Sequence, residues 1–516
     1  MAGSIEAEPI LRAVWIVGVL GHRRLADPAG VESVLEQELR ALSAGALARG
    51  GEIHLMASVA AGTDLLAIRA ARRLGLPVHL VLPLAEEDFL EDFACHPEAL
   101  PEAKAALAGA RGNLERDSVS VALTRGSRPA CYFDTDVRIL ESADLVLAVW
   151  DGQPGGGLGG TGQLVALGTA MRKPMRVIDP GRLTVTLQHY DPQAWPPFDP
   201  QWNWIVQQGI VDPAPGCTTD QERCRTIKAR LSRAAQTDAF DFRHAAQQLI
   251  LLGALGGLIG MTHVILAGRN LGVLVTILQA LQFVLSVWAL RERRRLTRVA
   301  LVEKWTNARV GAEICRGLEA SLPYASPFRP TAGDLLPEWR RFAVSFGVLA
   351  QRHRQAHLAR QPDALATFRE EYGRDRLEGQ QQYFAAALVR SGRWGRRLPL
   401  IARRCAQATP IFVAGAMLNR AAKLDLGAHL WGMVLVMVLP AVLPIVAAVA
   451  DGLASSFDHA RRSQRFRALA QALGQRREEL RELRTEDSVR DLVEKCERQL
   501  LVEQVEWRYV TRKIKV

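Results

Sequence analysis

A glycine-rich turn between an apolar strand and a helix occupies residues 145–169, LVLAVWDGQPGGGLGGTGQLVALGT. Residues 145–150 are short and apolar, as in a buried parallel strand. The glycines at 155–157, 159 and 160 leave the backbone free to bring its N–H groups close to an anion. Thr161 can cap a helix that starts near Gln163, and the first-turn amides of such a helix favour a phosphate. The stretch therefore predicts a phosphate-binding turn, with a plain flexible loop as the alternative.

Strands and helices alternate over the first third of the chain. Apolar strands are expected at 13–20, 53–59, 78–83, 145–150 and 176–179, separated by segments with helical spacing. This alternation predicts a doubly wound, Rossmann-like α/β domain. Gly21, His22 and Arg23 follow the first strand at once, which suits a nucleotide-binding crevice at the carboxyl edge of a parallel sheet.

Five blocks of this region resemble one protein family. In chain order they are VGVLGHR, SVAAGTDLLA, VLPLAEEDFLEDF, DTDVRILESADLVLAVWDG and GGLGGTGQLVALG, and they span roughly residues 13–182. In this order they are similar to the SLOG superfamily, the Rossmann-like group that includes the LOG nucleotide hydrolases and the DprA-like proteins. The resemblance implies a nucleotide or nucleotide-derived ligand, which members of the family either cleave at the base or bind as a signal.

The resemblance also implies roles for individual residues. His22 and Arg23 match the GHR block and would contact a phosphate or diphosphate, the alternative being an ordinary surface arginine. Gly62 and Asp64 match the family's turn after the second strand, where Asp64 either accepts a hydrogen bond from a ribose hydroxyl or only caps its helix. In the glycine-rich loop, the residues expected to bind the ligand are Gly159, Gly160 and Thr161.

Three further charged residues are candidates for the same ligand site. Asp134 and Arg138 stand at positions i and i+4 of an expected helix, so they either face the ligand or pair with each other. Asp151 ends the strand that precedes the glycine-rich loop.

One residue departs from the family pattern. Close relatives tend to carry a glutamate two residues after Gly-Gly-Thr, where this chain has Gln163. An amide can hydrogen-bond a ribose hydroxyl or a base, but it cannot act as a carboxylate base. We therefore expect a binding protein rather than an enzyme, unless Asp134, Asp136 or Asp151 supplies the carboxylate.

The charge of the chain is unevenly distributed. The formal net charge is +11, and arginines crowd around two apolar blocks in the second half. Because Lys and Arg flank the cytoplasmic ends of membrane helices, direct nucleic-acid binding is the weaker explanation of this basicity. The seven cysteines form no CxxC pair, which argues against a zinc site and against a disulfide framework. We expect no metal, no cofactor and no cleavable signal peptide.

The two apolar blocks predict membrane helices. Residues 249–266 and 271–290 are long and uncharged enough for one transmembrane hairpin, and a second hairpin is expected at about 405–450. The span near 406–418 is short and contains Pro410. Arginine-rich flanks then place both termini in the cytoplasm of a multi-pass protein of the bacterial inner membrane.

The layout of the second half is similar to the SLATT membrane effector domains, which occur joined to SLOG domains in bacterial conflict systems. The expected domains are a nucleotide-binding domain at 1–185, a Pro- and Trp-rich linker or lid at 186–235, and two SLATT-like units at 236–330 and 331–516. The C-terminal helix is expected to pack on its neighbours or on a second subunit of a homo-oligomer.

Together these patterns predict a membrane-bound sensor of a second messenger, and the resemblance to the SLOG and SLATT families implies a role in antiphage defence. Its ligand would be an NAD- or ADP-ribose-type molecule or a cyclic nucleotide, and its helices would open or disrupt the lipid bilayer. The first alternative is a membrane-anchored nucleoside-phosphate N-glycosidase of the LOG type. The second is a scaffold whose Rossmann-like domain has lost its ligand.

Overall fold

The computed structural model describes residues 8–122, 126–154, 157–266, 272–298, 301–421, 432, 434–457 and 459–513. The chain divides into two compact units, each assembled from separate segments. Unit 1 comprises Met1–Arg230, Gly311–Phe368 and Arg484–Val502, and unit 2 comprises Leu231–Val310, Arg369–Leu483 and Glu503–Val516. The α/β region therefore shares its unit with segments from much later in the chain.

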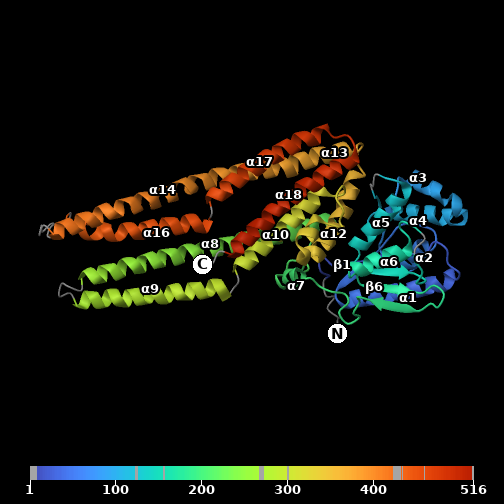
Figure 1. Cartoon of the computed structure of the whole chain (residues 1–516), viewed down its shortest axis with the longest axis horizontal. Helices are drawn as coiled ribbons and strands as arrows, with labels where there is room; N and C mark the ends of the chain where they lie inside the picture. The colour runs from blue at the N-terminus through green and yellow to red at the C-terminus, as the bar shows by residue number, and fades with distance from the viewer. Residues whose placement is uncertain are drawn as a thin grey trace. The chain divides into compact units, whose positions relative to one another are not determined.

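Unit 1 contains a seven-stranded sheet with the order β4-β3-β2-β1-β5-β6-β7 (Figure 1). Its strands are β1 (Ala13–Gly21), β2 (Gly51–Ala57), β3 (Val78–Leu82), β4 (Ser118–Val121), β5 (Leu145–Val149), β6 (Met175–Ile178) and β7 (Val185–Gln188). Neighbouring strands are parallel, except that β7 runs antiparallel to β6. β5 is buried throughout, which accounts for its continuous apolar sequence. The sheet is Rossmann-like.

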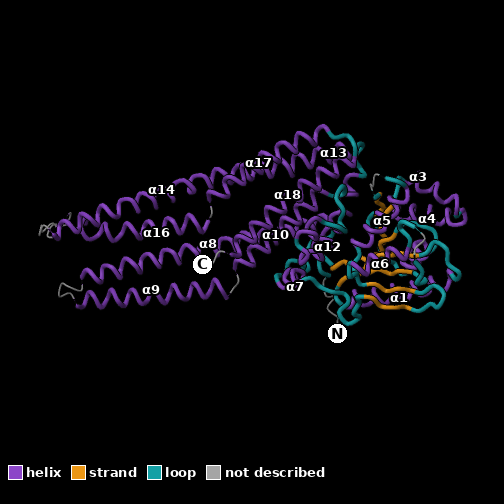
Figure 2. Tube along the Cα trace, viewed as in Figure 1, coloured by secondary structure: helices purple, strands orange, loops and turns teal. Residues whose placement is uncertain are grey.

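Helices connect the strands of this sheet (Figure 2). They are α1 (Pro28–Ala48), α2 (Thr63–Arg73), α3 (Glu86–Glu91), α4 (Leu100–Gly112), α5 (Arg128–Ser142) and α6 (Thr161–Ala170), with 3-10 turns at η1 (Asp92–Cys95) and η2 (Pro97–Ala99). The start of α1 shows how the sequence sets such a boundary. Asp27 accepts a hydrogen bond from the Gly30 N–H at 2.9 Å, and Pro28 occupies the first turn, where no N–H is needed.

Later segments complete unit 1. α7 (Pro200–Gln207), α11 (Thr331–Leu335), η3 (Pro337–Trp339) and α12 (Arg340–Leu358) lie wholly within it. Four helices begin in one unit and end in the other: α8 (Asp220–Leu266), α10 (Leu301–Ser321), α13 (Ala364–Glu371) and α18 (Glu486–Lys513). α12 packs against the sheet through Val344 and Val348, which share a buried core with Val14 and Ile16 of β1.

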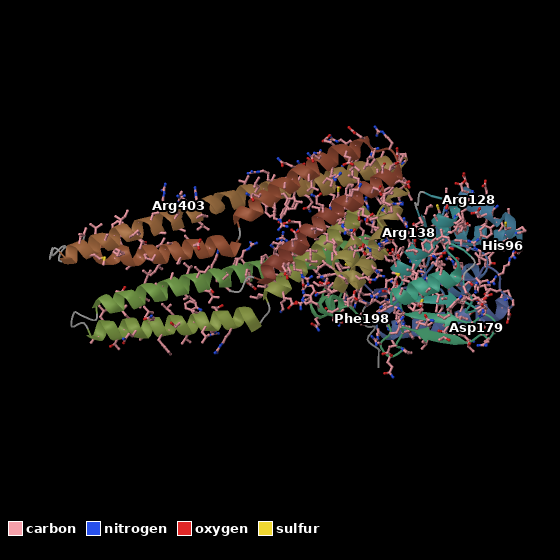
Figure 3. The ribbon with its side chains drawn as sticks, viewed as in Figure 1. His96, Arg128, Arg138, Asp179, Phe198 and Arg403 are labelled. Carbon is pink, nitrogen blue, oxygen red and sulfur yellow. The ribbon has the colours of Figure 1, made fainter. Side chains whose placement is uncertain are left out.

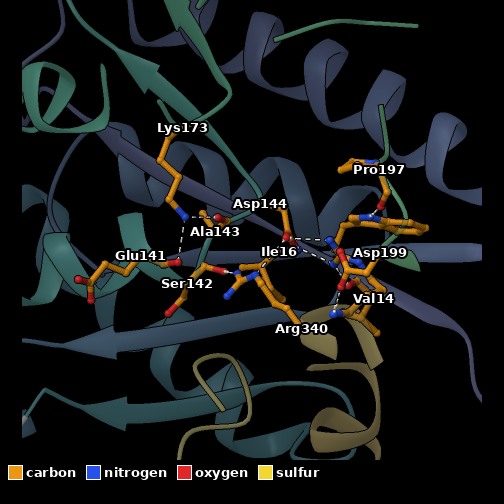
Figure 4. A network of polar contacts seen from close by, with 12 residues as sticks. Val14, Ile16, Glu141, Ser142, Ala143, Asp144, Lys173, Pro197, Asp199 and Arg340 are labelled. Carbon is orange, nitrogen blue, oxygen red and sulfur yellow. Dashed lines mark hydrogen bonds and ion pairs between the residues drawn. The ribbon is translucent and has the colours of Figure 1, made fainter. Parts of the chain in front are cut away.

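A buried ion pair anchors α12 to the sheet (Figure 4). Asp144, between α5 and β5, accepts hydrogen bonds from Nη1 and Nη2 of Arg341 at 2.9 and 2.8 Å. It also accepts the Ile16 N–H at 2.8 Å, and Arg341 donates to the Val14 carbonyl. Burial alone would raise the pKa of Asp144, but Arg341 and Arg340 outweigh burial and lower it to about 2. The carboxylate is therefore charged over the whole physiological range.

The described residues of unit 2 are helical except at Leu483. η4 (Tyr372–Glu378), α14 (Gly379–Ala421), η6 (Val434–Val438), α16 (Leu439–Phe457) and α17 (His459–Glu482) lie within it, together with α9 (Gly272–Arg298) and most of α8. α8 and α9 pack through a small core that contains Leu252, Ile259 and Leu285. α14 runs through Pro399 and Pro410 without ending, and α16 lies alongside it in Figure 1.

The membrane part of the sequence prediction is wrong. Across the described ranges, no helix combines the length and the apolar character that crossing a bilayer would need. Of the first predicted hairpin, residues 249–266 lie in α8, which begins at Asp220, and residues 272–290 lie in α9. The start of the second, up to residue 421, lies in α14, which also carries Arg403 and Arg404 (Figure 3 labels Arg403). Residues 267–271, 422–431 and 433 of the predicted hairpins lie outside the described residues. The prediction of a four-span protein of the inner membrane with cytoplasmic termini is therefore wrong.

Candidate functional site

The order of the strands identifies one position in the sheet for a ligand. β1 lies between β2 and β5, so the chain builds outward from β1 on one side through β4 and then crosses to β5 on the other. Loops that leave the carboxyl ends of β1 and β5 therefore diverge, and a crevice forms between them in open α/β sheets. Residues after Gly21 and after Val149 are the ones that this topology brings together.

His22 and Asp151 meet at this edge. Nε2 of His22 lies 3.2 Å from Oδ1 of Asp151 and 3.2 Å from its backbone nitrogen. A hydrogen bond from the Gln153 N–H, and then His22, lower the pKa of Asp151. Both side chains are partly exposed. The pair therefore fixes the start of the glycine-rich loop and leaves the carboxyl edge of the sheet accessible to solvent.

The glycine-rich loop leads directly into α6. The helix begins at Thr161 with Gly160 as its N-cap, so the expected start near Gln163 and the expected capping role of Thr161 are wrong. The amides of Gln163 and Leu164 donate to the Gly160 carbonyl at 2.9 and 3.2 Å, whereas helix geometry leaves those of Thr161 and Gly162 without intrahelical acceptors. Because glycine has no side chain to cap them, these amides suit an anion.

The Gln163 side chain forms a hydrogen bond with the backbone of the glycine-rich loop. Its Oε1 accepts the Gly159 N–H at 3.0 Å. Gly159 has φ +81°, and a Cβ there would lie 3.6 Å from Cα of Phe133 on α5. The Gln163 side chain is thus engaged by the loop itself. The predicted loop glycines at 155 and 156 lie outside the described residues.

The turn after β2 is locked onto the end of β1. Gly62 has φ +85°, and a Cβ at this position would lie 2.5 Å from the carbonyl oxygens of both His22 and Arg23. Thr63 donates to the His22 carbonyl through its N–H at 3.2 Å and its hydroxyl at 3.0 Å. Gly21 and Gly62 are required here because the two chain segments approach too closely for side chains.

Asp64 is buried beside this turn. It accepts hydrogen bonds from the Ser58 hydroxyl and, at 3.3 Å, from the Ala60 N–H. Gly62, not Asp64, is the N-cap of α2, so the capping alternative is wrong. Burial raises the pKa of Asp64 to about 6 against the opposing effect of these hydrogen bonds and of Arg23.

Asp136 of α5 lies close enough to Asp64 to sense its charge. Burial, and then the charge of Asp64, raise the pKa of Asp136 well above its ordinary value, while Arg23 lowers it. Two neighbouring carboxyl groups beside one arginine can therefore retain a proton near neutral pH. Such a pair can both donate to and accept from a hydroxyl group.

The remaining charged candidates divide into two arrangements. Arg138, labelled in Figure 3, donates to Asp134 at 2.8 Å, which is the i,i+4 pairing that was the alternative to ligand contact. Arg23 instead places its guanidinium 4.9 Å from the centre of the Tyr132 ring. His22, Arg23, Gly62 and Asp64 thus lie around one edge together with Asp151 and the loop, while Arg138 is engaged along its own helix.

Ser58 and Tyr132 were not predicted. Ser58 directly follows β2, and this position at a strand end was the available signal. Tyr132 lies in the first turns of α5, and only the three-dimensional packing brings it to Arg23. Within the described residues, no group of three or more His, Cys, Asp or Glu side chains could hold a metal ion.

Compared with known proteins, the chain matches no protein-family model and no curated protein sequence.

Proposed function

We propose that unit 1 binds a phosphorylated, nucleotide-type ligand at the β1/β5 crevice and acts as a sensor that does not cleave it. The observation that carries the proposal is the glycine-capped start of α6, directly after a glycine-rich loop at the topological switch point. Helix amides and their dipole favour an anionic group at this position. The expected ligands are NAD- or ADP-ribose-type molecules and cyclic nucleotides.

The arrangement of the carboxylates favours binding over hydrolysis. Asp134 is paired with Arg138, Asp151 with His22, and the amide of Gln163 replaces the family's glutamate. Each of these side chains makes a hydrogen bond or an ion pair with a neighbouring residue of the protein. They do not converge on one reacting atom. At these three positions the chain can contact a nucleotide without offering a carboxylate base for glycosidic cleavage.

A nucleoside-phosphate N-glycosidase is the second candidate, and the Asp64–Asp136 pair favours it. Two carboxyl groups with shifted pKa values beside a ligand crevice are the usual requirement for acid–base chemistry on a ribose. Ligand recovery after binding separates the two functions.

The test uses the full chain, because unit 1 includes segments up to Val502. Calorimetric titration with NAD, ADP-ribose, cyclic ADP-ribose isomers and cyclic oligonucleotides is followed by chromatography of each mixture. A ligand that binds and is recovered intact supports the sensor, and a ligand that is consumed supports the glycosidase. Absence of binding across the panel would contradict both and favour a scaffold.

Gly160→Asp tests the location of the site. Gly160 has φ −66° and ψ 147°, which an aspartate adopts without strain, and the new carboxylate would cap α6 and occupy the amides offered to the ligand. We expect binding to be lost while the free energy of unfolding stays the same or rises by about a few tenths of a kcal/mol. Gly112→Asp, at the end of α4 where nothing lies within 4 Å, is the matched control and should bind normally.

A further inference from the structure

The Arg23 side chain is held at the candidate site by an aromatic ring. Its guanidinium carbon lies 4.9 Å from the centre of the Tyr132 ring. In the part of the chain that the structure describes, the side chain makes no hydrogen bond or ion pair, and the residue is exposed. A guanidinium that stacks through its face keeps its N–H groups along the edge free for a phosphate.

Neighbouring side chains fix the position of the Tyr132 ring. Its hydroxyl donates to Oδ2 of Asp92 at 2.8 Å, and Asp92 also forms an ion pair with Arg128. Phe89 packs beside the ring, with the ring centres 6.4 Å apart. The ring therefore has a defined position on α5, and the guanidinium that lies over it has fewer orientations to lose when a ligand binds.

The local charge leaves Arg23 available to an anion. Arg23 acts electrostatically on Asp64 and Asp136, yet it forms no direct pair with either. Because burial favours the protonated form of both carboxyl groups, their combined negative charge near neutral pH is smaller than two. The positive charge of Arg23, which Asp64 and Asp136 do not fully neutralise, is then available to a phosphate group of the ligand.

We propose that Tyr132 is a positioning residue, which orients Arg23 toward a phosphate or diphosphate group and so makes the site prefer phosphorylated ligands. The inference rests on the proposed nucleotide-binding function. It adds a residue that no sequence pattern indicated, and a chemical basis for selectivity: planar, bidentate recognition of a phosphate by an arginine whose orientation is set in advance.

The experiment compares two probes, ADP-ribose and adenosine, by calorimetry on the full chain. Tyr132→Leu should weaken ADP-ribose binding by about three- to fivefold, the size of an exposed cation–π contact, and leave adenosine binding unchanged. Tyr132→Phe keeps the ring and should bind ADP-ribose within about twofold of the unaltered chain. Combined with Arg23→Ala, Tyr132→Leu should cause no further loss, because its effect acts through Arg23.

The chain offers a matched control. Tyr190 also carries an arginine over its ring, with Arg176 4.6 Å from the ring centre, near β6 and β7. Tyr190→Leu therefore removes the same kind of contact elsewhere in unit 1, together with a hydrogen bond from Arg176 to the Tyr190 hydroxyl, and should leave ADP-ribose binding unchanged.

Three results would overturn the proposal, and they separate it from the proposed function. Unchanged ADP-ribose binding in Tyr132→Leu would show that Tyr132 does not position Arg23, and it would leave the proposed nucleotide site unaffected. Equal losses for ADP-ribose and adenosine, or a further loss in the double variant, would show that Tyr132 only supports the local structure. If the unaltered chain bound neither probe and no other nucleotide, both the function and this role would be wrong.

Discussion

Arg341 grips both oxygens of Asp144, with Nη1 2.9 Å from Oδ2 and Nη2 2.8 Å from Oδ1, although the two residues are 197 positions apart in the chain. Both side chains are almost completely buried. The pair fixes the first turn of α12 to the strand β1 and to the residue that precedes β5. It thereby joins the segment 311–368 to the sheet of unit 1.

We expect Asp144→Ala to lower the free energy of unfolding by about 3–5 kcal/mol, because Arg341 would remain as an unpaired buried charge. Chemical denaturation monitored by circular dichroism measures this change. Asp134→Ala is the control, since its ion pair with Arg138 is partly exposed and should contribute less than about 1 kcal/mol. Equal effects of the two substitutions would contradict the role given to burial.

Gly62→Ala should destabilise the protein more than Gly50→Ala. Both glycines have positive φ, +85° and +74°, but a Cβ at Gly62 would meet two carbonyl oxygens at 2.5 Å, whereas nothing lies within 4 Å at Gly50. We expect about 1–2 kcal/mol for Gly50→Ala from backbone strain alone, and about 2–5 kcal/mol for Gly62→Ala, because the steric clash adds to the strain. Thermal melts compare the variants, and a similar loss in both would show that the turn can move away from β1.

A buried pair of histidines should make the protein sensitive to acid. Nδ1 of His54 lies 2.8 Å from Nε2 of His79, and Glu52 and Ser118 bond the outer ring nitrogens at 3.0 and 2.9 Å. Every ring nitrogen in this row of hydrogen bonds has a partner when Ser118 donates to His79, His79 donates to His54, and His54 donates to Glu52. This assignment of the tautomers follows from the hydrogen-bond network. Both imidazoles are then neutral.

Burial lowers the pKa of both histidines. Since the unfolded chain takes up these protons near pH 6.5 and the folded chain only at lower pH, stability should fall as the pH drops below about 6.5. Denaturation between pH 7.5 and 5 measures this loss. His79→Gln should reduce the slope of stability against pH, and an unchanged slope would assign the acid sensitivity to other groups.

Asp64 should couple ligand binding to pH. Its pKa of about 6 means that it loses a proton between roughly pH 5 and 7. If a phosphate binds beside Arg23, affinity for ADP-ribose should rise by less than about tenfold as the pH falls from 7.5 to 5.5, because the site becomes less negative. Asp64→Asn should flatten this dependence in calorimetric titrations. A steep dependence in that variant would point to Asp136 or to the ligand itself.

The sequence indicates the sheet better than it indicates what covers it. Strands such as 145–149 are continuous apolar runs beside glycine turns, and the carboxyl-edge rule correctly brings His22 toward Asp151. Arg341 has no local pattern that points to Asp144, because the partner is chosen by tertiary packing. The apolar blocks were interpreted as membrane spans from their hydropathy, but no helix among the described residues has the length and the apolar character that crossing a bilayer would need.

The site divides in the same way. Gly159 has the positive φ that a glycine-rich turn allows, and Gly62, which the family resemblance singled out, has one too. The start of α6 was misplaced because glycine can serve as an N-cap without any side-chain signal. Tyr132 could not be found, since its contact with Arg23 depends on how α5 lies on β1, where Gly18 allows Ala143 and Ile139 to approach.

The discontinuity of unit 1 has a consequence for synthesis on the ribosome. At about 5–20 residues per second, Arg341 emerges on the order of 10–40 s after Asp144. During that interval the nascent sheet carries a carboxylate whose buried counter-ion has not yet been made. The α/β region is therefore incompletely folded during this interval, with one face of its sheet uncovered and open to chaperone binding. Native packing of its core becomes possible only after most of the polypeptide has been translated.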